Sequence, residues 1–349
     1  MEQVLQQFCL DGTPVSCEPF GNGHINRTFH VVCDNKKEYT LQRINRVAFQ
    51  HPEELIENID AVSHFIASKN IGLESIHLRK AKDGKKYYID ANGEFWRAYD
   101  FISGGICVDL PRDRNDFYQA AVAFGKFQQA LADFPAATLH ETITHFHDTV
   151  DRLARLRASV QADRADRAAA VEPELTFIFD REQELGTLCR MQRSGALPLR
   201  VTHNDTKLNN VLLDNKTGEG VCVIDLDTVM PGSLLYDYGD ALRFGGSSGA
   251  EDERDLDKIY FKVENFTAFT KGFLEELTSI TDAELELLPF SIKLMTLECG
   301  SRFLADYLNG DTYFKTAYPE HNLVRARTQF KLVRDIEDKY DELCRIVHE

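Results

Sequence analysis

Residues 201–227, VTHNDTKLNNVLLDNKTGEGVCVIDLD, constrain the possible fold more than any other part of this chain. Asp205 is followed five positions later by Asn210, and a further stretch leads to Asp225. The stretch 211–224 has apolar residues at both ends and a polar, glycine-containing middle, which predicts two short strands joined by a turn. Such a hairpin would bring Asn210 and Asp225 to the same side of a site.

This spacing is the one that phosphoryl transfer uses. One aspartate accepts the proton of an attacking hydroxyl, while an asparagine and a second aspartate hold Mg²⁺ on the nucleotide phosphates. Mg²⁺ takes one or two protein oxygen ligands and fills its remaining positions with phosphate and water. We therefore expect Asp205 to be the general base and Asn210 and Asp225 to be the Mg²⁺ ligands. Lys207 could stabilise the transition state or lie in solvent, and His203 is expected to brace the loop.

Length and charge narrow the class of protein. The chain has 349 residues, which suits one large domain or two lobes. Its formal net charge of −16 opposes binding to nucleic acid or to an anionic membrane, although it could favour a cationic substrate. The first residues lack the pattern of a basic stretch followed by an apolar stretch, so we expect no signal peptide, and the apolar runs are too short to span a membrane. Eight cysteines without a C-x-x-C pair fit a reducing compartment, so we expect a cytoplasmic protein.

The order of expected elements predicts two lobes. The N-terminal part favours strands and one helix that starts at Pro52, with strands expected at 15–20, 28–33, 38–44, 76–78, 86–89 and 94–101. A candidate hinge follows at 103–105. The remainder favours helices, expected at 115–131, 144–160, 172–192, 255–276, 282–308 and from 320 onward. We predict an α+β, two-lobed, protein-kinase-like fold, with a nucleotide-binding lobe at 1–102 and a catalytic and acceptor-binding lobe at 103–349.

Two segments of the first lobe are candidates for the nucleotide phosphates. Gly21, Asn22 and Gly23 lie between two expected strands, where glycine lets backbone amides approach phosphate oxygens. Protein kinases carry a phosphate-binding lysine on the third strand. Here that position falls on Gln42, with Arg43 on the opposite face. Gln42 could hydrogen-bond the phosphates without charge, or Arg43 could supply the cation.

The strand at 94–101 leads into the candidate hinge. We expect its backbone groups near Tyr99 and Phe101 to contact adenine, with ATP as the phosphoryl donor. The aromatic rings of this strand are more often part of the lobe core than a stacking surface, so only the backbone is given this role.

Several sequence strings resemble those of the aminoglycoside phosphotransferase and choline kinase superfamily, which is related to the protein kinases. The similarity covers nearly the whole chain and rests on GNGHIN at 21–26, HFHDT at 145–149, VTHNDTKLNN at 201–210, IDLDTVMPGS at 224–233, RFG at 243–245, ECGSRFLADYL at 298–308 and YPEHNLVRARTQ at 318–329. The kinase motif alone identifies the superfamily. The C-terminal strings are more specific, and they are similar to those of kinases that act on N-acetylhexosamines.

That resemblance implies an ATP- and Mg²⁺-dependent kinase that phosphorylates the anomeric C1 hydroxyl of GlcNAc or GalNAc to the α-1-phosphate. It also implies that His24, Phe244, Arg302 and Tyr313 contact the sugar beside Asp205. The implied partners are a small-molecule sugar and ATP, bound by a monomer or weak homo-oligomer. Two alternatives stay open: a kinase of another small alcohol, such as choline, an aminoglycoside or a different sugar, and a catalytically silent nucleotide- or sugar-binding pseudokinase.

Overall fold

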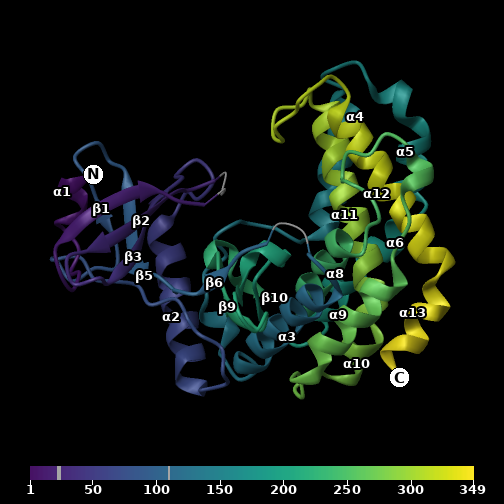
Figure 1. The fold of residues 1–349 in the computed structure, drawn as a ribbon. Coiled ribbons are helices and arrows are strands. Elements are labelled where there is room, and N and C mark those ends of the chain that lie inside the picture. Colours follow the sequence, from purple (N-terminus) through teal and green to yellow (C-terminus); the bar gives the residue numbers. More distant parts are fainter. Residues whose placement is uncertain (22–24, 109–110) are drawn as a thin grey trace.

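The computed structural model describes residues 1–21, 25–108 and 111–349 and has two lobes (Figure 1). The smaller lobe is built on an antiparallel sheet, and the larger lobe is mostly helical. This arrangement confirms the predicted α+β, protein-kinase-like fold. Among the described residues, every helix is too short or too polar to cross a membrane.

The small lobe contains a five-stranded sheet in the order β1-β2-β3-β5-β4. Its elements are α1 (Glu2–Leu5), β1 (Pro14–Pro19), β2 (Arg27–Cys33), β3 (Glu38–Ile44), α2 (Pro52–Lys69), β4 (Tyr88–Ile89) and β5 (Phe95–Asp100). Trp96 and Leu41 face an outer core that includes α1, while Ile44 and Phe95 face the core shared with α2. The β3–β5 register sets Gln42 opposite Arg97, so these two side chains share the inner face.

The large lobe places its longest helix in the middle of a helical layer. Its helices are α3 (Arg114–Ala130), α4 (Thr149–Ala162), α5 (Glu172–Phe179), α6 (Glu182–Leu185), α7 (Thr187–Arg193), α8 (Leu234–Gly245), α9 (Val263–Glu275), α10 (Asp282–Glu286), α11 (Leu288–Leu308), α12 (His321–Asp338) and α13 (Tyr340–Val347). Helix α11 packs against α12, α8 and α4. Gly239 permits the α8–α11 approach, because a Cβ there would lie 2.5 Å from the carbonyl oxygen of Ser291.

Short strands of the large lobe carry the predicted motif. They are β6 (Gly105–Ile106), β7 (Arg200–Thr202), β8 (Val211–Asp214), β9 (Gly220–Val223) and β10 (Met230–Gly232). Strands β8 and β9 form the expected hairpin, and β6 pairs with β8 directly after the candidate hinge. The two lobes also meet through Asn58 of α2, whose Nδ2 donates to the carbonyl oxygen of Val229 at 3.0 Å.

Several predicted elements differ from the structure. The segment 76–78 is not a strand, because it makes only an isolated bridge between Leu78 and Tyr99. The predicted helix at 144–160 begins only at Thr149, since the side chain of Asp148 caps it. The predicted helices at 172–192, 255–276 and 282–308 are each divided into shorter segments, and in the last case Pro289 stands in the first turn of a new helix.

Candidate active site

The loop that follows β7 is held rigidly by buried hydrogen bonds. The backbone N–H groups of His203 and Asn204 donate to the carboxylate of Asp237 at 2.9 and 2.8 Å. The ring of His203 is buried, and its Nε2 lies 2.9 Å from the carbonyl oxygen of Ile224. Asn204 has a φ of +66° and donates through Nδ2 to the carbonyl oxygen of Thr228 at 2.8 Å. These bonds fix the position of the next residue, Asp205.

Asp205 is partly accessible and is bordered by a cation and an amide. Nζ of Lys207 lies 2.5 Å from Oδ1 of Asp205, and Nδ2 of Asn210 donates to Oδ2 at 3.0 Å. Burial lowers the pKa of Lys207, but the adjacent Asp205 carboxylate outweighs this effect and leaves that pKa above its ordinary value. Lys207 therefore carries a positive charge directly beside the proposed base.

The hairpin brings Asn210 and Asp225 together. The backbone N–H of Ile224 donates to the carbonyl oxygen of Asn210 at 2.9 Å, which makes Asp225 a neighbour of Asn210 across the two strands. Because the Asn210 amide directs Nδ2 toward Asp205, its Oδ1 is the atom left to accept a cation.

Asp225 has the chemistry of a cation ligand. Asp225 is an exposed residue, although many protein atoms surround its carboxylate. The loss of solvation that they cause, together with the carboxylates of Asp227 and Asp205, raises the pKa of Asp225 to about 7. A divalent cation would relieve that repulsion, so Asn210 and Asp225 fit Mg²⁺. The described residues contain no group of three or more His, Cys, Asp or Glu side chains suited to a metal, so phosphate and water would complete the coordination.

A buried ion pair that we did not predict connects this loop to the small lobe. Nη1 of Arg97, on β5, lies 2.6 Å from Oδ1 of Asp227, and both side chains are 4% exposed. Asn26 donates through Nδ2 to Oδ2 of the same carboxylate at 2.5 Å. Burial lowers the pKa of Arg97, but Asp227 outweighs it and holds that pKa above its ordinary value.

The position that a lysine occupies in protein kinases is therefore filled differently. Oε1 of Gln42 accepts from Nε and Nη2 of Arg97 at 2.8 and 2.6 Å, and its Nε2 donates to Thr28. Arg43 lies on the opposite face, where Nη1 contacts Glu94 at 2.8 Å. The buried cation on the inner face is Arg97, and not Arg43 as we had considered. Only the cross-strand register, which pairs Gln42 with Arg97, could have revealed it.

Of the other candidate nucleotide residues, Tyr99 lies two positions after Arg97 on β5 and so shares its face of the sheet. Tyr99 is half-buried, and the guanidinium carbon of Arg97 lies 6.0 Å from the centre of its ring. The N–H of Phe101 donates to the carbonyl oxygen of Glu38, so this donor is not available to adenine as we had expected. The ring of Phe101 instead lies 4.4 Å from that of His30, between centroids. Gly21 has a φ of +79°, while Asn22, Gly23 and His24 lie outside the described residues.

Arg302 of α11, which we expect at the acceptor, is half-buried. Its guanidinium carbon is 5.6 Å from the ring centres of both Phe146 and Phe314. Within residues 1–21, 25–108 and 111–349 this guanidinium makes no hydrogen bond or ion pair. Tyr313 is close by, 73% exposed, with its ring edge-on to Phe314 at 4.8 Å. Phe244 is exposed near the end of α8.

The loop that carries Tyr313 is fixed by a buried carboxylate that the sequence did not single out. Asp306 accepts the backbone N–H groups of Thr312, Tyr313 and Phe314 at 3.0, 2.8 and 2.9 Å. It also accepts Nδ2 of Asn322 at 2.9 Å. In Figure 1 this yellow-green loop before α12 projects from the top of the large lobe. Asp306 thus sets where Tyr313 lies relative to Arg302.

Solved structures of other proteins have the same fold. The chain is similar over 98% of its length to 97% of a microcompartment-associated aminopropanol kinase, with 16% identity and a TM-score of 0.68. It is also similar over 97% of its length to 92% of an amicoumacin kinase in complex with AMP-PNP and Ca²⁺, with 16% identity and a TM-score of 0.62. A third similar structure is an aminoglycoside phosphotransferase from Alicyclobacillus acidocaldarius, with 12% identity, 98% of this chain and 96% of that chain covered, and a TM-score of 0.63.

These likenesses show the fold, and a family model extends the assignment to the sequence. Residues 16–268 match the model described as Phosphotransferase enzyme family. The matched range includes the sheet of the small lobe, the loop with Asp205 and the hairpin that ends near Asp225. The chain therefore belongs to the phosphotransferase enzyme family.

Proposed function

We propose that this phosphotransferase transfers the γ-phosphoryl group of ATP to the anomeric C1 hydroxyl of an N-acetylhexosamine, GlcNAc or GalNAc. The products would be the α-1-phosphate and ADP. The observation that carries the choice of acceptor is Arg302, a guanidinium bordered by aromatic rings that forms no salt bridge in the described residues, although it interacts electrostatically with the buried Glu298 carboxylate. Its donors suit the hydroxyl and amide oxygens of a neutral sugar, and the adjacent rings suit its apolar face.

The residues of the loop support a direct transfer. Asp205 would accept the proton of the C1 hydroxyl as the C1 oxygen bonds to the γ-phosphorus and the bond to the β,γ-bridging oxygen breaks. Lys207, 2.5 Å from Asp205, would stabilise negative charge that develops on the transferred group. Mg²⁺ held by Asn210 and Asp225 would neutralise charge on the nucleotide phosphates. Catalysis would come mainly from this positioning.

Charge around Arg302 favours a neutral acceptor over a cationic one. The nearby carboxylates are already engaged: Glu298 with His147, Asp240 with Arg243, and Asp306 with backbone N–H groups. An ammonium group would thus meet the Arg302 cation rather than a carboxylate that lacks a partner. A kinase of a cationic alcohol remains the second candidate, because the similar structures include kinases named for aminopropanol and for aminoglycosides.

The proposal also opposes a silent pseudokinase. Asp205, Asn210 and Asp225 lie together in an arrangement that has a proton acceptor and two oxygen ligands. Arg97 supplies a buried cation on the face where the lysine would be expected. All residues of the proposed reaction come from one chain, so we propose a monomer or weak homo-oligomer. We also propose that the protein acts in the cytoplasm, where ATP is available.

A substrate screen tests the reaction. Purified protein with ATP and Mg²⁺ would be given GlcNAc, GalNAc, glucose, choline and kanamycin, with ADP release as the readout and ³¹P NMR to identify an anomeric phosphate. We expect turnover with the N-acetylhexosamines. Efficient turnover of choline or kanamycin in their place would refute the proposed acceptor.

A variant tests the role of Arg302. Loss of hydrogen bonds from a charged donor costs roughly 1.5–3 kcal/mol, so Arg302→Ala should raise KM for the sugar by about 10- to 150-fold, at roughly 1.4 kcal/mol per factor of ten. KM for ATP should be nearly unchanged. Arg334→Ala is the matched control. Arg334 also lies over an aromatic ring, that of Phe177 at 5.0 Å, but it belongs to α12 and has no role in the proposed acceptor site. An unchanged sugar KM in the Arg302 variant would contradict the proposal.

A further inference from the structure

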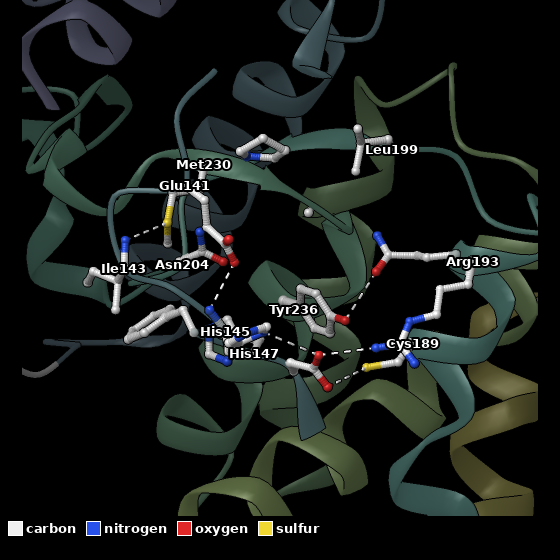
Figure 2. A pocket seen from close by; sticks show the side chains of 15 residues that line it. Glu141, Ile143, His145, His147, Cys189, Arg193, Leu199, Asn204, Met230 and Tyr236 are labelled. Atoms are coloured by element: carbon white, nitrogen blue, oxygen red, sulfur yellow. Dashed lines mark hydrogen bonds and ion pairs between the residues drawn. The ribbon is translucent and has the colours of Figure 1, made fainter. Parts of the chain in front are cut away.

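A cavity of about 190 Å³ lies beside the loop of Asp205 in the large lobe (Figure 2). It is lined by the segment before α4, by α7, by β10 and by Tyr236 of α8. Asn204 contributes to its wall, whereas Asp205, Arg302 and Tyr313 do not line it. The cavity therefore adjoins the proposed acceptor site only through Phe146, which lines the cavity and also contacts Arg302. None of its other lining residues has a role in the proposed reaction.

His147 lines this cavity, and its ring has a buried nitrogen without a partner in the described residues. Its Nδ1 lies 3.1 and 3.2 Å from the two carboxylate oxygens of Glu298, a residue outside the cavity lining. Since Nδ1 faces Glu298, Nε2 on the far edge of the ring faces the other way. His147 is 8% exposed, and its Nε2 has no hydrogen-bond partner among the described residues. A buried polar atom without a partner is unfavourable, which indicates that a ligand or solvent group satisfies it.

Gln192 of α7 adds a second polar atom of this kind. The hydroxyl of Tyr236 donates to Oε1 of Gln192 at 3.3 Å, as the dashed line in Figure 2 shows. This bond leaves Nε2 of Gln192 as a buried donor that lacks a partner within the described ranges. The rings of Tyr236 and Phe146 flank His147, at 5.2 and 4.5 Å between centroids. The cavity therefore combines a donor, an imidazole nitrogen and aromatic walls.

Charged groups at the cavity are matched to each other. Asp148 contacts Arg193 at 3.2 Å and His145 at 3.6 Å, and Glu141 accepts the backbone N–H of His145 at 2.9 Å. Cys189 also contacts the Asp148 carboxylate, with its Sγ 3.7 Å from Oδ1. An anion would therefore find no unpaired cation among the described lining residues, and the only carboxylate there without a charged partner is that of the exposed Glu141.

We propose that this cavity is a second binding site, for a small neutral polyhydroxylated molecule. A hydroxyl can both donate to and accept from His147 Nε2, and another can accept from Gln192 Nε2. The volume is below the roughly 300–1,000 Å³ of drug-sized sites, which limits the ligand to about the size of a single sugar ring or a shorter polyol.

Binding of a polyol in this cavity would affect binding of the sugar beside Arg302. Glu298, which binds His147, also lies 3.7 Å from Nε of Arg152, and Phe146 contacts both the cavity and Arg302. A ligand that fixes His147 and Phe146 would thus change the surroundings of Arg302. This consequence rests on the proposed function, whereas the binding site itself does not.

Binding of a polyol to this cavity is best measured in a variant whose proposed acceptor site has been disrupted, such as Arg302→Ala. The probes are glycerol, erythritol and myo-inositol, which have no anomeric hydroxyl, with inorganic phosphate and choline as charged comparisons. Saturation-transfer NMR and titration would be carried out on the wild type, Arg302→Ala, Gln192→Leu and the double variant. We expect at least one neutral polyol to bind the wild type and Arg302→Ala alike, and Gln192→Leu to raise its Kd at least tenfold. Gln183→Leu, at an exposed position on the adjacent α6, is the matched control and should leave Kd unchanged.

Three outcomes would overturn the inference: no binding of any neutral polyol, preferential binding of phosphate or choline, or binding that is lost with Arg302→Ala but kept with Gln192→Leu. His147→Gln gives a second test, with a larger Kd expected, and its thermal unfolding identifies a variant that fails to fold. Polyol binding without sugar phosphorylation would support this site while refuting the proposed function, so the two failures are distinguishable.

Discussion

Replacing Arg97 with methionine should destabilise the protein strongly, because it leaves Asp227 buried without its cation. The two side chains are each 4% exposed and approach within 2.6 Å. At an effective dielectric constant of about 20 their attraction is roughly 6 kcal/mol, part of which desolvation cancels. Removing one partner of such a buried pair costs about 3–5 kcal/mol. We therefore expect Arg97→Met to lower the free energy of unfolding by that amount.

The chain contains a convenient probe and a control for this measurement. Trp96 is the only tryptophan and is buried on β5 next to Arg97, so its fluorescence during urea unfolding reports on the small lobe. Arg43→Met is the matched control on the neighbouring strand. Its ion pair with Glu94 is 28% and 39% exposed and should contribute less than about 1 kcal/mol. If Arg97→Met costs no more than Arg43→Met, the ion pair does not stabilise the junction of the lobes.

Three further predictions concern the proposed reaction. Asp205→Asn should keep the fold and reduce kcat by about 10²- to 10⁴-fold, and near-normal kcat in a folded variant would remove Asp205 from its proposed role. Asp225→Ala should abolish Mg²⁺-supported activity, whereas an unchanged Mg²⁺ titration would show that the metal ligand is elsewhere. Asp306→Asn should raise the sugar KM by roughly 3- to 30-fold through loss of one or two hydrogen bonds, with KM for ATP unchanged. Equal changes in both KM values would indicate general unfolding rather than a displaced Tyr313 loop.

Many strands and helices could be predicted from the sequence, because each depends mainly on residues that are close together in the chain. The strands at 28–33 and 38–44 and the helix from Pro52 lie within one residue of their predicted limits. The hairpin of β8 and β9 also follows from its own residues, since apolar strands flank a polar turn. Segments with a competing cap or proline were predicted less well, because Asp148 and Pro289 start helices inside ranges with continuous helical periodicity.

Side-chain partners from distant parts of the chain were not predictable in the same way. Arg97 and Asp227 are 130 positions apart, and only the completed fold puts them 2.6 Å from each other. The sequence instead directed attention to Gln42 and Arg43, because a lysine is expected on that strand. Strand alternation placed these two on opposite faces, but it did not reveal that the neighbouring strand supplies the buried arginine.

The same distinction between local and distant contacts bears on how substrate choice arises in this family. The loop of Asp205 is fixed by its own lobe core, through backbone N–H groups bound to Asp237, and these contacts do not depend on the acceptor. Arg302 and Tyr313 come from α11 and from the loop that Asp306 holds. If Arg302 and Tyr313 bind the acceptor as proposed, changes in that loop would alter the acceptor without disturbing the position of Asp205, because specificity would then rest on residues other than those that fix the Asp205 loop.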